Sequence, residues 1–190
     1  MSRQSVITLV IIVSVVCIAG WYAYFVTQKA NVADYSDSAA ANSLQTRPDQ
    51  TPYTDINGNQ VYLDDYLGKV LVVNSWASWC PACAQVLPEL SKLGQQYETQ
   101  GVVVLAINRA EPVATAQSFL RSVNAVEGVK LVLDPSDRYF GSVDGFTMPE
   151  TLFYDTNGNV VVHKRGPMNF SEMSSYVQKI ITVPEVINEP

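Results

Sequence analysis

Hydrophobic residues fall into one long run near the N-terminus and a series of short clusters after residue 50. The long run, residues 6–26, contains no charged side chain. The later clusters are bounded by polar residues, glycine or proline. Short apolar runs are typical of buried strands, and apolar residues three or four positions apart indicate helices. The pattern therefore predicts an apolar N-terminal segment followed by one domain of strands and helices.

This domain is predicted to begin with a hairpin at residues 55–61, because Asn57-Gly58 is a strong two-residue turn signal. Further strands are expected at residues 70–75, 102–107, 130–133, 151–154 and 160–163. Helices are expected at residues 81–97, 113–122, 136–140 and 171–181, the last with Ser171 as its N-cap. Such alternation, ending in a hairpin and a helix, predicts an α/β fold with a mixed central sheet flanked by helices.

Two of the three cysteines lie in a Trp-Cys-Pro-Ala-Cys segment, residues 79–83, where strand 70–75 ends and the next helix begins. Proline suits the first helical position, so we expect Pro81 there and Cys80 as the N-cap. The Cys80 sulfur would then face free N–H groups and the positive end of the helix dipole, which favour the thiolate. Cys83 is close enough to form a disulfide. The pair is predicted to exchange disulfides, with Cys80 as nucleophile and Cys83 as resolving thiol.

Two other interpretations of the cysteine pair are a metal half-site and a purely structural disulfide. A zinc site needs about four ligands, but the third cysteine, Cys17, lies far away in the apolar run, where it is expected to be an apolar filler. The only histidine, His163, is expected to be a surface residue. A structural disulfide at this spacing would close a very short loop and stabilise little. We therefore expect no metal and no cofactor.

The cysteine segment resembles the thioredoxin superfamily, specifically its membrane-anchored TlpA-like and ResA-like branch and the related cytochrome c maturation thioredoxins. The matching stretch is residues 70–83, followed by residues 87–90, in which Pro88 sits where thioredoxins carry a helix-kinking proline. A second match, residues 145–153, resembles the segment that carries the family's cis-proline, here Pro149. The resemblance covers residues 51–190 and implies a thioredoxin-like fold. Relative to a minimal thioredoxin, residues 108–146 hold an additional helix and strand, which are either extra core or a partner-selecting insertion.

The resemblance also implies roles around the cysteines. A cis bond before Pro149 would lie against the pair, and Met148 would offer its backbone to the partner's chain, with Thr147 beside it. Trp79 would cover the sulfur and contact partners, although structural cover alone is an equally good interpretation. Trp76 is expected in the core. Together with Asn74, Pro81 and Ala82, these residues would support the active site.

Two positions depart from the family pattern. Thioredoxin has a buried aspartate where this chain has Asn74, and ResA-like proteins carry a glutamate where it has Val86. Because asparagine does not titrate, the proton of Cys83 needs another acceptor. Glu150, next to the expected cis-proline, is the candidate proton acceptor, since burial there would raise its pKa towards the working pH. The alternative is that Glu150 is a solvated charge at a strand edge.

The N-terminal run, residues 6–26, is long enough to span a bilayer as a signal-anchor helix. A cleaved signal peptide would have a shorter apolar core with a cleavage site close behind it, and Ala39 to Ala41 lie too far downstream. Residues 1–5 are predicted as a cytoplasmic tail. Residues 27–50, which are polar and rich in alanine, serine and asparagine, are predicted as a flexible linker. The charges that flank the span only slightly favour one orientation in the membrane. The short tail and the redox motif favour an orientation with the domain outside the cytoplasm.

These features lead to one functional hypothesis, a membrane-tethered, extracytoplasmic thiol–disulfide oxidoreductase that reduces exported proteins. Its partners would be disulfide-containing extracytoplasmic proteins and an upstream membrane thiol donor. Nucleic acid is not expected, because the net charge is −6 and no basic run is present. The alternatives are an oxidising disulfide-exchange protein, and a tethered substrate-binding or chaperone module without redox turnover.

Overall fold

The computed structural model describes residues 17–18 and 51–182, and the fold lies in the second of two units into which the chain divides, Gln45–Pro190. The elements follow one another along the chain as β1 (Tyr53–Asp55), β2 (Gln60–Val61), η1 (Leu63–Tyr66), β3 (Val70–Trp76), α2 (Cys83–Tyr97), η2 (Glu98–Gln100), β4 (Val102–Arg109), α3 (Val113–Ser122), β5 (Lys130–Asp134), α4 (Arg138–Ser142), β6 (Glu150–Tyr154), β7 (Val160–Arg165) and α5 (Phe170–Thr182).

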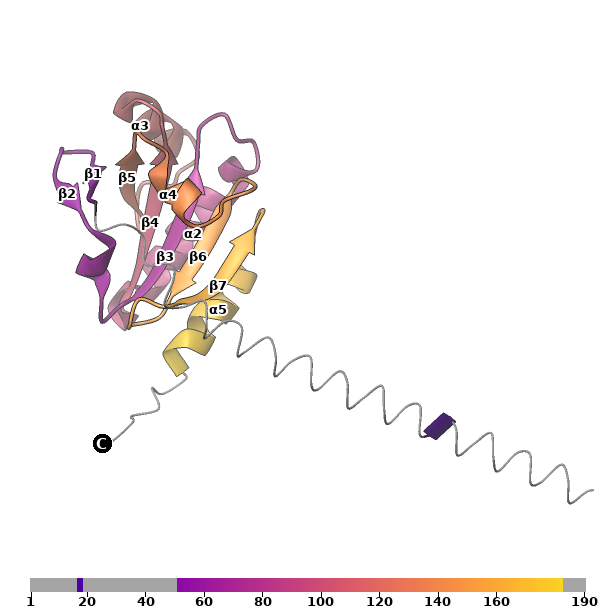
Figure 1. Ribbon diagram of the computed structural model, residues 1–190. Coiled ribbons are helices and arrows are strands. Elements are labelled where there is room, and N and C mark those ends of the chain that lie inside the picture. Colours follow the sequence, from indigo (N-terminus) through magenta and orange to yellow (C-terminus); the bar gives the residue numbers. More distant parts are fainter. Residues whose placement is uncertain (1–16, 19–50, 183–190) are drawn as a thin grey trace, which may run out of the picture. The chain divides into compact units, whose positions relative to one another are not determined.

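The seven strands form one mixed sheet in the order β2-β1-β5-β4-β3-β6-β7 (Figure 1). Strand β3 runs parallel to β4, and β4 runs parallel to β5. On the other side, β6 is antiparallel to β3 and β7 is antiparallel to β6. All seven residues of β3 are buried, as expected for a central strand with both faces covered. The predicted mixed sheet is thus confirmed.

Alternate residues of β3 point to the two faces of this sheet. Val70, Val72 and Trp76 pack in a core cluster with side chains of α2, α3 and α5, and this cluster includes both Cys80 and Cys83. We call this side of the sheet the cysteine face. Leu71 and Val73 belong to a second cluster with Tyr139 of α4 and Tyr154 of β6. We call that side the opposite face.

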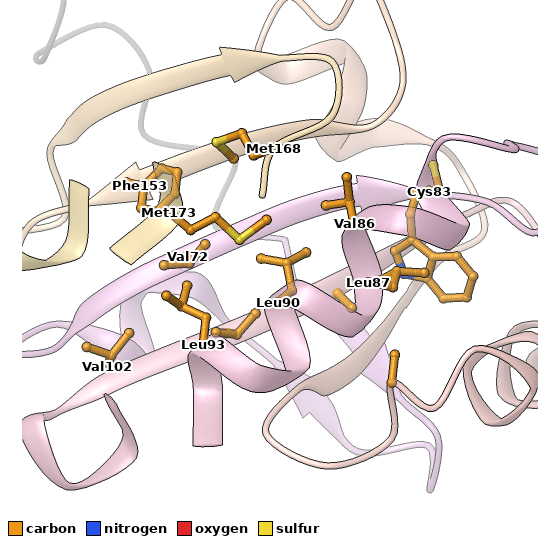
Figure 2. Close-up of a cluster of buried hydrophobic side chains, with 14 of the residues drawn as sticks. Val72, Cys83, Val86, Leu87, Leu90, Leu93, Val102, Phe153, Met168 and Met173 are labelled. Carbon is orange, nitrogen blue, oxygen red and sulfur yellow. The ribbon is translucent and has the colours of Figure 1, made fainter. Parts of the chain in front are cut away.

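Helix α2 packs its apolar residues onto the cysteine face, as the predicted helical spacing requires. Val86, Leu90, Leu93 and Tyr97 are all buried. Figure 2 shows the first three of these one after another along the helix that begins at Cys83. Truncating one such leucine to alanine typically costs about 2–5 kcal/mol. The packing of α2 therefore fixes the position of Cys83 at its first turn.

Most predicted elements are confirmed within one or two residues, and α3 has the expected bounds. The N-cap of α5 is a correction: Asn169 Oδ1, not Ser171, accepts the N–H of Glu172, at 2.9 Å. The insertion within residues 108–146 contributes to the core, because β5 lies between β4 and β1, and both Val132 and Tyr139 are buried.

Among residues 17–18 and 51–182, no helix is both long and apolar enough to cross a membrane. The predicted tail 1–5, the linker 27–50 and, except for residues 17–18, the predicted span 6–26 lie outside the described residues. The same holds for residues 183–190 of the predicted domain.

Candidate active site

The two cysteines of the segment 79–83 form a disulfide in this structure. Their Cα atoms are 5.3 Å apart, a separation that a disulfide spans without backbone movement. The bond lies in the connection between β3 and α2. Cys80 is 5 % exposed and Cys83 is fully buried. Cys80 is therefore the sulfur that a partner can reach more easily, in agreement with its predicted role as nucleophile.

The start of α2 differs from the prediction. The helix begins at Cys83 with Ala82 at the N-cap position, so Pro81 and Cys80 do not occupy the first helical and N-cap positions. Residues 80–83 instead form a turn closed by the Cys83 N–H and the Cys80 carbonyl, 3.1 Å apart. The same N–H lies 3.1 Å from the Cys80 sulfur. One N–H at the helix start, shared between the Cys80 carbonyl and the Cys80 sulfur, thus still reaches the sulfur, and this contact favours the thiolate once the disulfide is reduced.

The Met148–Pro149 peptide bond is cis, as the resemblance implied. Pro149 directly precedes β6, whose first residue, Glu150, pairs with Ser75 near the end of β3. We call residues 143–149 the cis-proline loop and residues 77–82 the cysteine loop. Both loops therefore lie at the same end of the sheet. Met148 is half-buried and packs against the cluster that contains both cysteines, and Thr147 is also half-buried.

Asn74 is fully buried on the cysteine face. Its side-chain amide donates to Thr151 Oγ1 at 2.8 Å and to the Glu150 carbonyl at 3.3 Å. Its own side-chain oxygen has no hydrogen-bond partner among residues 51–182. The position that carries an acid in thioredoxin is thus occupied by a neutral amide with a free acceptor.

Glu150 does not have the position predicted for it. It shares the opposite face with Leu152 and Tyr154, because side chains alternate along β6 and those two belong to the cluster on that side. Thr151, one residue later, faces Asn74 instead. The prediction that Glu150 lies beside the cysteines is therefore wrong. The alternative, a solvated charge, is also wrong, because Glu150 is 0 % exposed.

The Glu150 carboxylate is held by three groups. Its Oε1 lies 2.6 Å from His163 Nε2 and accepts from Arg165 Nε at 3.0 Å, and its Oε2 accepts the Phe146 N–H at 3.0 Å. The β6–β7 register places Arg165 opposite Glu150 and His163 opposite Leu152, so all these side chains share one face. His163 is exposed, as the sequence suggested, and it is also a partner of a buried carboxylate. Glu150 ties the cis-proline loop to β7.

Glu111 is a site residue that the sequence analysis missed. Its Oε2 accepts the backbone N–H of Ser78 at 2.8 Å and its Oε1 the Ser78 hydroxyl at 2.5 Å. Asn108, the partner of Trp76 across β3 and β4, donates to Oε2 at 2.7 Å. Glu111 therefore holds the cysteine loop from the end of β4. The sequence contained a signal for this contact: Glu111 and Ser78 each follow one of two neighbouring parallel strands, and the loops after such strands lie at the same edge of the sheet.

The two tryptophans near the cysteines have different environments. Trp76 is buried and stacked on Phe119, with ring centroids 5.6 Å apart, which confirms its predicted place in the core. Trp79 is 64 % exposed next to Cys80. Ala82 is half-buried against the core cluster, and Val86 lies within it. An acid in place of Val86 would therefore be buried in an apolar environment in this chain, which is unfavourable.

Comparison with known proteins gives a consistent result. The family model described as "AhpC/TSA family" matches residues 39–163. The thiol-disulfide oxidoreductase ResA of Geobacillus kaustophilus is 30 % identical over 159 residues, which are 84 % of each chain. The ResA of Bacillus subtilis is 28 % identical over 126 residues, which are 66 % of this chain and 69 % of that one.

Similar solved structures include one protein from Chlorobium tepidum and one from Bacillus subtilis. One is a putative thiol:disulfide interchange protein DsbE from Chlorobium tepidum, with a TM-score of 0.64, 24 % identity and coverage of 70 % of this chain and 94 % of that one. The other is StoA from Bacillus subtilis, with a TM-score of 0.59, 18 % identity and coverage of 70 % and 98 %. At these identities the likeness concerns the fold, which is thioredoxin-like.

Proposed function

Because this chain belongs to the AhpC/TSA family and is a thiol–disulfide oxidoreductase, we propose that it is tethered to a bacterial membrane and reduces disulfides of exported proteins. The observation that carries the chemistry is the Cys80–Cys83 disulfide at the start of α2, with Cys80 the more accessible sulfur. The tether is supported by the uncharged run 6–26 in the sequence. The reducing direction is supported by the resemblance to ResA-like proteins.

The proposed cycle starts from the reduced pair. The Cys80 thiolate attacks one sulfur of the substrate disulfide, so that a mixed disulfide forms and the other substrate sulfur leaves as a thiolate. Cys83 then loses its proton and attacks the Cys80 sulfur. This step breaks the mixed disulfide, forms the Cys80–Cys83 bond and releases the substrate as a dithiol. Two electrons pass from the cysteine pair to the substrate, and an upstream thiol donor restores them.

The proton of Cys83 needs an acceptor in this cycle. The carboxylates of Glu111 and Glu150 are already hydrogen-bonded to other groups, and Glu150 faces away from the cysteines. We therefore assign the proton to the substrate thiolate released in the first step, which is a base formed at the site. Asn74, whose side-chain oxygen has no partner among residues 51–182, would accept a hydrogen bond from the Cys83 thiol without taking its proton. Trp79, Thr147 and Met148 would contact the substrate chain next to the disulfide.

A trapping experiment in bacterial cells tests the function and the compartment. Full-length chain carrying Cys83→Ala cannot resolve the mixed disulfide, so it should accumulate exported proteins bound through Cys80. The matched control carries Cys80→Ala as well and should capture none. Capture of cytosolic proteins alone would refute the proposed compartment. An empty trap, with the variant folded, would favour a binding module without redox turnover.

The direction of exchange has its own test, the reduction potential of the pair in the full-length chain. Pairs in this fold range from about −270 mV for thioredoxin to about −120 mV for a strong oxidant. A reductant should lie near the lower end of that range, and a value near the upper end would assign the chain to oxidation.

A further inference from the structure

Phe146 is the most exposed large hydrophobic side chain among the described residues, at 87 %. It lies in the cis-proline loop, three positions before Pro149. An aromatic ring of this size gains much from burial when a partner covers it. A single exposed apolar residue needs no explanation on an ordinary surface. The backbone of Phe146 and of the residues before it is, however, held by several hydrogen bonds.

The backbone of Phe146 is held by a buried charge. Its N–H donates to Glu150 Oε2 at 3.0 Å, and Glu150 is fully buried and contacts Arg165 and His163 through its other oxygen. A hydrogen bond to a charged acceptor is stronger than one between neutral groups. The position of the Phe146 backbone therefore depends on an ion-pair cluster on the opposite face of the sheet.

The residues before Phe146 are held as well. Gly145 donates its N–H to the Phe140 carbonyl at 2.8 Å, and a Cβ at Gly145 would come within 2.5 Å of the Phe140 ring. Phe140 in turn stacks under the Arg109 guanidinium, 3.5 Å from the ring centroid. Arg165 also donates to the Asp144 carbonyl at 3.3 Å. The loop thus presents the Phe146 ring to solvent from a fixed backbone.

We propose that Phe146 is a substrate-docking residue that binds an apolar side chain, of the leucine or phenylalanine type, close to the target disulfide. The site rests on the proposed function, since the cis-proline loop and the cysteine loop lie at the same end of the sheet. Apolar chemistry follows from the ring itself, because Glu150, the carboxylate hydrogen-bonded to the Phe146 backbone, is paired with Arg165 and His163 and adds no free charge there. The occupant is an extended or unfolded segment of the substrate, because most large apolar side chains of a folded protein are buried.

The test uses two disulfide peptides that differ in one residue beside the cysteine, leucine in one and serine in the other. Phe146→Ala in the full-length chain should raise KM for the leucine peptide about tenfold, with kcat nearly unchanged, as expected for losing part of one buried ring. The serine peptide and hydroxyethyl disulfide, which needs no docking, should react at the wild-type rate. Phe146→Leu should restore most of the lost affinity.

Ile56→Ala is the matched control, because Ile56 is another exposed apolar residue, 44 % exposed, in the β1–β2 hairpin. It should leave both peptides unaffected. Equal KM values for the leucine peptide in wild type and Phe146→Ala would overturn the docking site.

A binding measurement separates this proposal from the proposed function. Leucine and serine peptides with the cysteines replaced by serine cannot exchange disulfides, so their affinity reports docking alone. Tighter binding of the leucine peptide that is lost in Phe146→Ala supports the docking site, even if the wild type reduces neither reactive peptide and the reductase proposal fails. Affinities that do not depend on Phe146 overturn the docking site, whatever the turnover.

Discussion

The cysteine loop and the cis-proline loop are each held by one carboxylate, but in different ways. Glu111 is half-buried, and within residues 51–182 it accepts only from neutral donors, the backbone and hydroxyl of Ser78 and the amide of Asn108. Glu150 is fully buried and contacts Arg165 and His163 as well as a backbone N–H. The difference follows from burial, because a carboxylate removed from water needs a paired cation, whereas a partly hydrated one does not.

The comparison also shows what neither carboxylate does. Both have their oxygens committed to holding a loop, and neither hydrogen bond network includes a cysteine sulfur. The cysteine face has neutral polar groups, Asn74 and Thr151, at the position where thioredoxin has an acid. The acids of this site therefore position the two loops, and the exchange chemistry belongs to the sulfurs.

The largest effect should come from Glu150→Ala. This change removes a fully buried carboxylate and leaves the Phe146 N–H, Arg165 and His163 without their acceptor. Breaking a buried pair costs about 3–5 kcal/mol, and about 3 kcal/mol is expected here because Arg165 is half-exposed and can be rehydrated. Urea unfolding of the full-length chain measures the change. A loss below about 1 kcal/mol would mean that Glu150 behaves as a surface charge.

The next effect should come from Asn74→Asp, which puts a titratable group on the cysteine face. Burial should raise the pKa of the new carboxyl above its unfolded value of about 3.9. Such a group costs stability as pH rises above about 4, so the variant should lose about 2 kcal/mol relative to wild type between pH 4 and pH 7. The exchange rate should also gain a new pH dependence.

Glu150→Gln is the matched variant for this experiment, since it removes a charge from the opposite face. Its pH–rate profile should keep the wild-type shape, because Glu150 faces away from the sulfurs. A profile that changes for Glu150→Gln and not for Asn74→Asp would reverse the assignment of the two faces.

These predictions depend on features that the sequence shows to different degrees. The cysteine pair, the cis-proline segment and the helical face of α2 follow from local patterns. The face to which Glu150 points cannot be predicted from a local pattern. The alternation of side chains along a strand shows only that Glu150 and Thr151 point to opposite sides of the sheet. Which of the two sides holds the cysteines is decided by tertiary packing. His163 and Arg165, at alternate positions of the next strand, could have indicated the partners of Glu150. The hydrogen bonds from Ser78 to Glu111 join two loops that only the parallel pairing of β3 and β4 brings together.

A smaller effect is expected from Glu111→Ala. The carboxylate is partly exposed and its partners can be rehydrated, so the free energy of unfolding should fall by about 1 kcal/mol. The cysteine loop of the variant should become less well ordered. Its disulfide-exchange rate should therefore fall below the wild-type rate even under conditions in which the variant stays fully folded. Glu111→Gln keeps an acceptor for the Ser78 N–H and should restore part of the rate. A stability loss equal to that of Glu150→Ala would contradict the contrast between the two carboxylates.

The smallest effect concerns two tyrosines on the opposite face. Burial raises the pKa of Tyr139 and of Tyr154, whose hydroxyls lie 2.9 Å apart. In the unfolded chain both ionise near pH 10, while in the folded protein they stay neutral to higher pH. Stability is therefore fully present below about pH 9 and falls above it, by about 0.5 kcal/mol near pH 9.7 for the two tyrosines together. Tyr154→Phe should reduce this alkaline loss, and an unchanged slope would show that other groups cause it.

The central claim is that Cys80 is the attacking sulfur, and thiol alkylation of the reduced full-length chain tests it most directly. Both variants, Cys80→Ser and Cys83→Ser, should carry Cys17→Ala so that only one thiol reacts. The Cys83→Ser protein should alkylate fast, with a rate–pH midpoint below the value of about 8.5 for a free thiol, because the Cys83-position N–H stabilises the Cys80 thiolate. The Cys80→Ser protein should react slowly, since Cys83 is buried. If Cys80→Ser alkylates as fast as Cys83→Ser, the assignment of nucleophile and resolving thiol is contradicted.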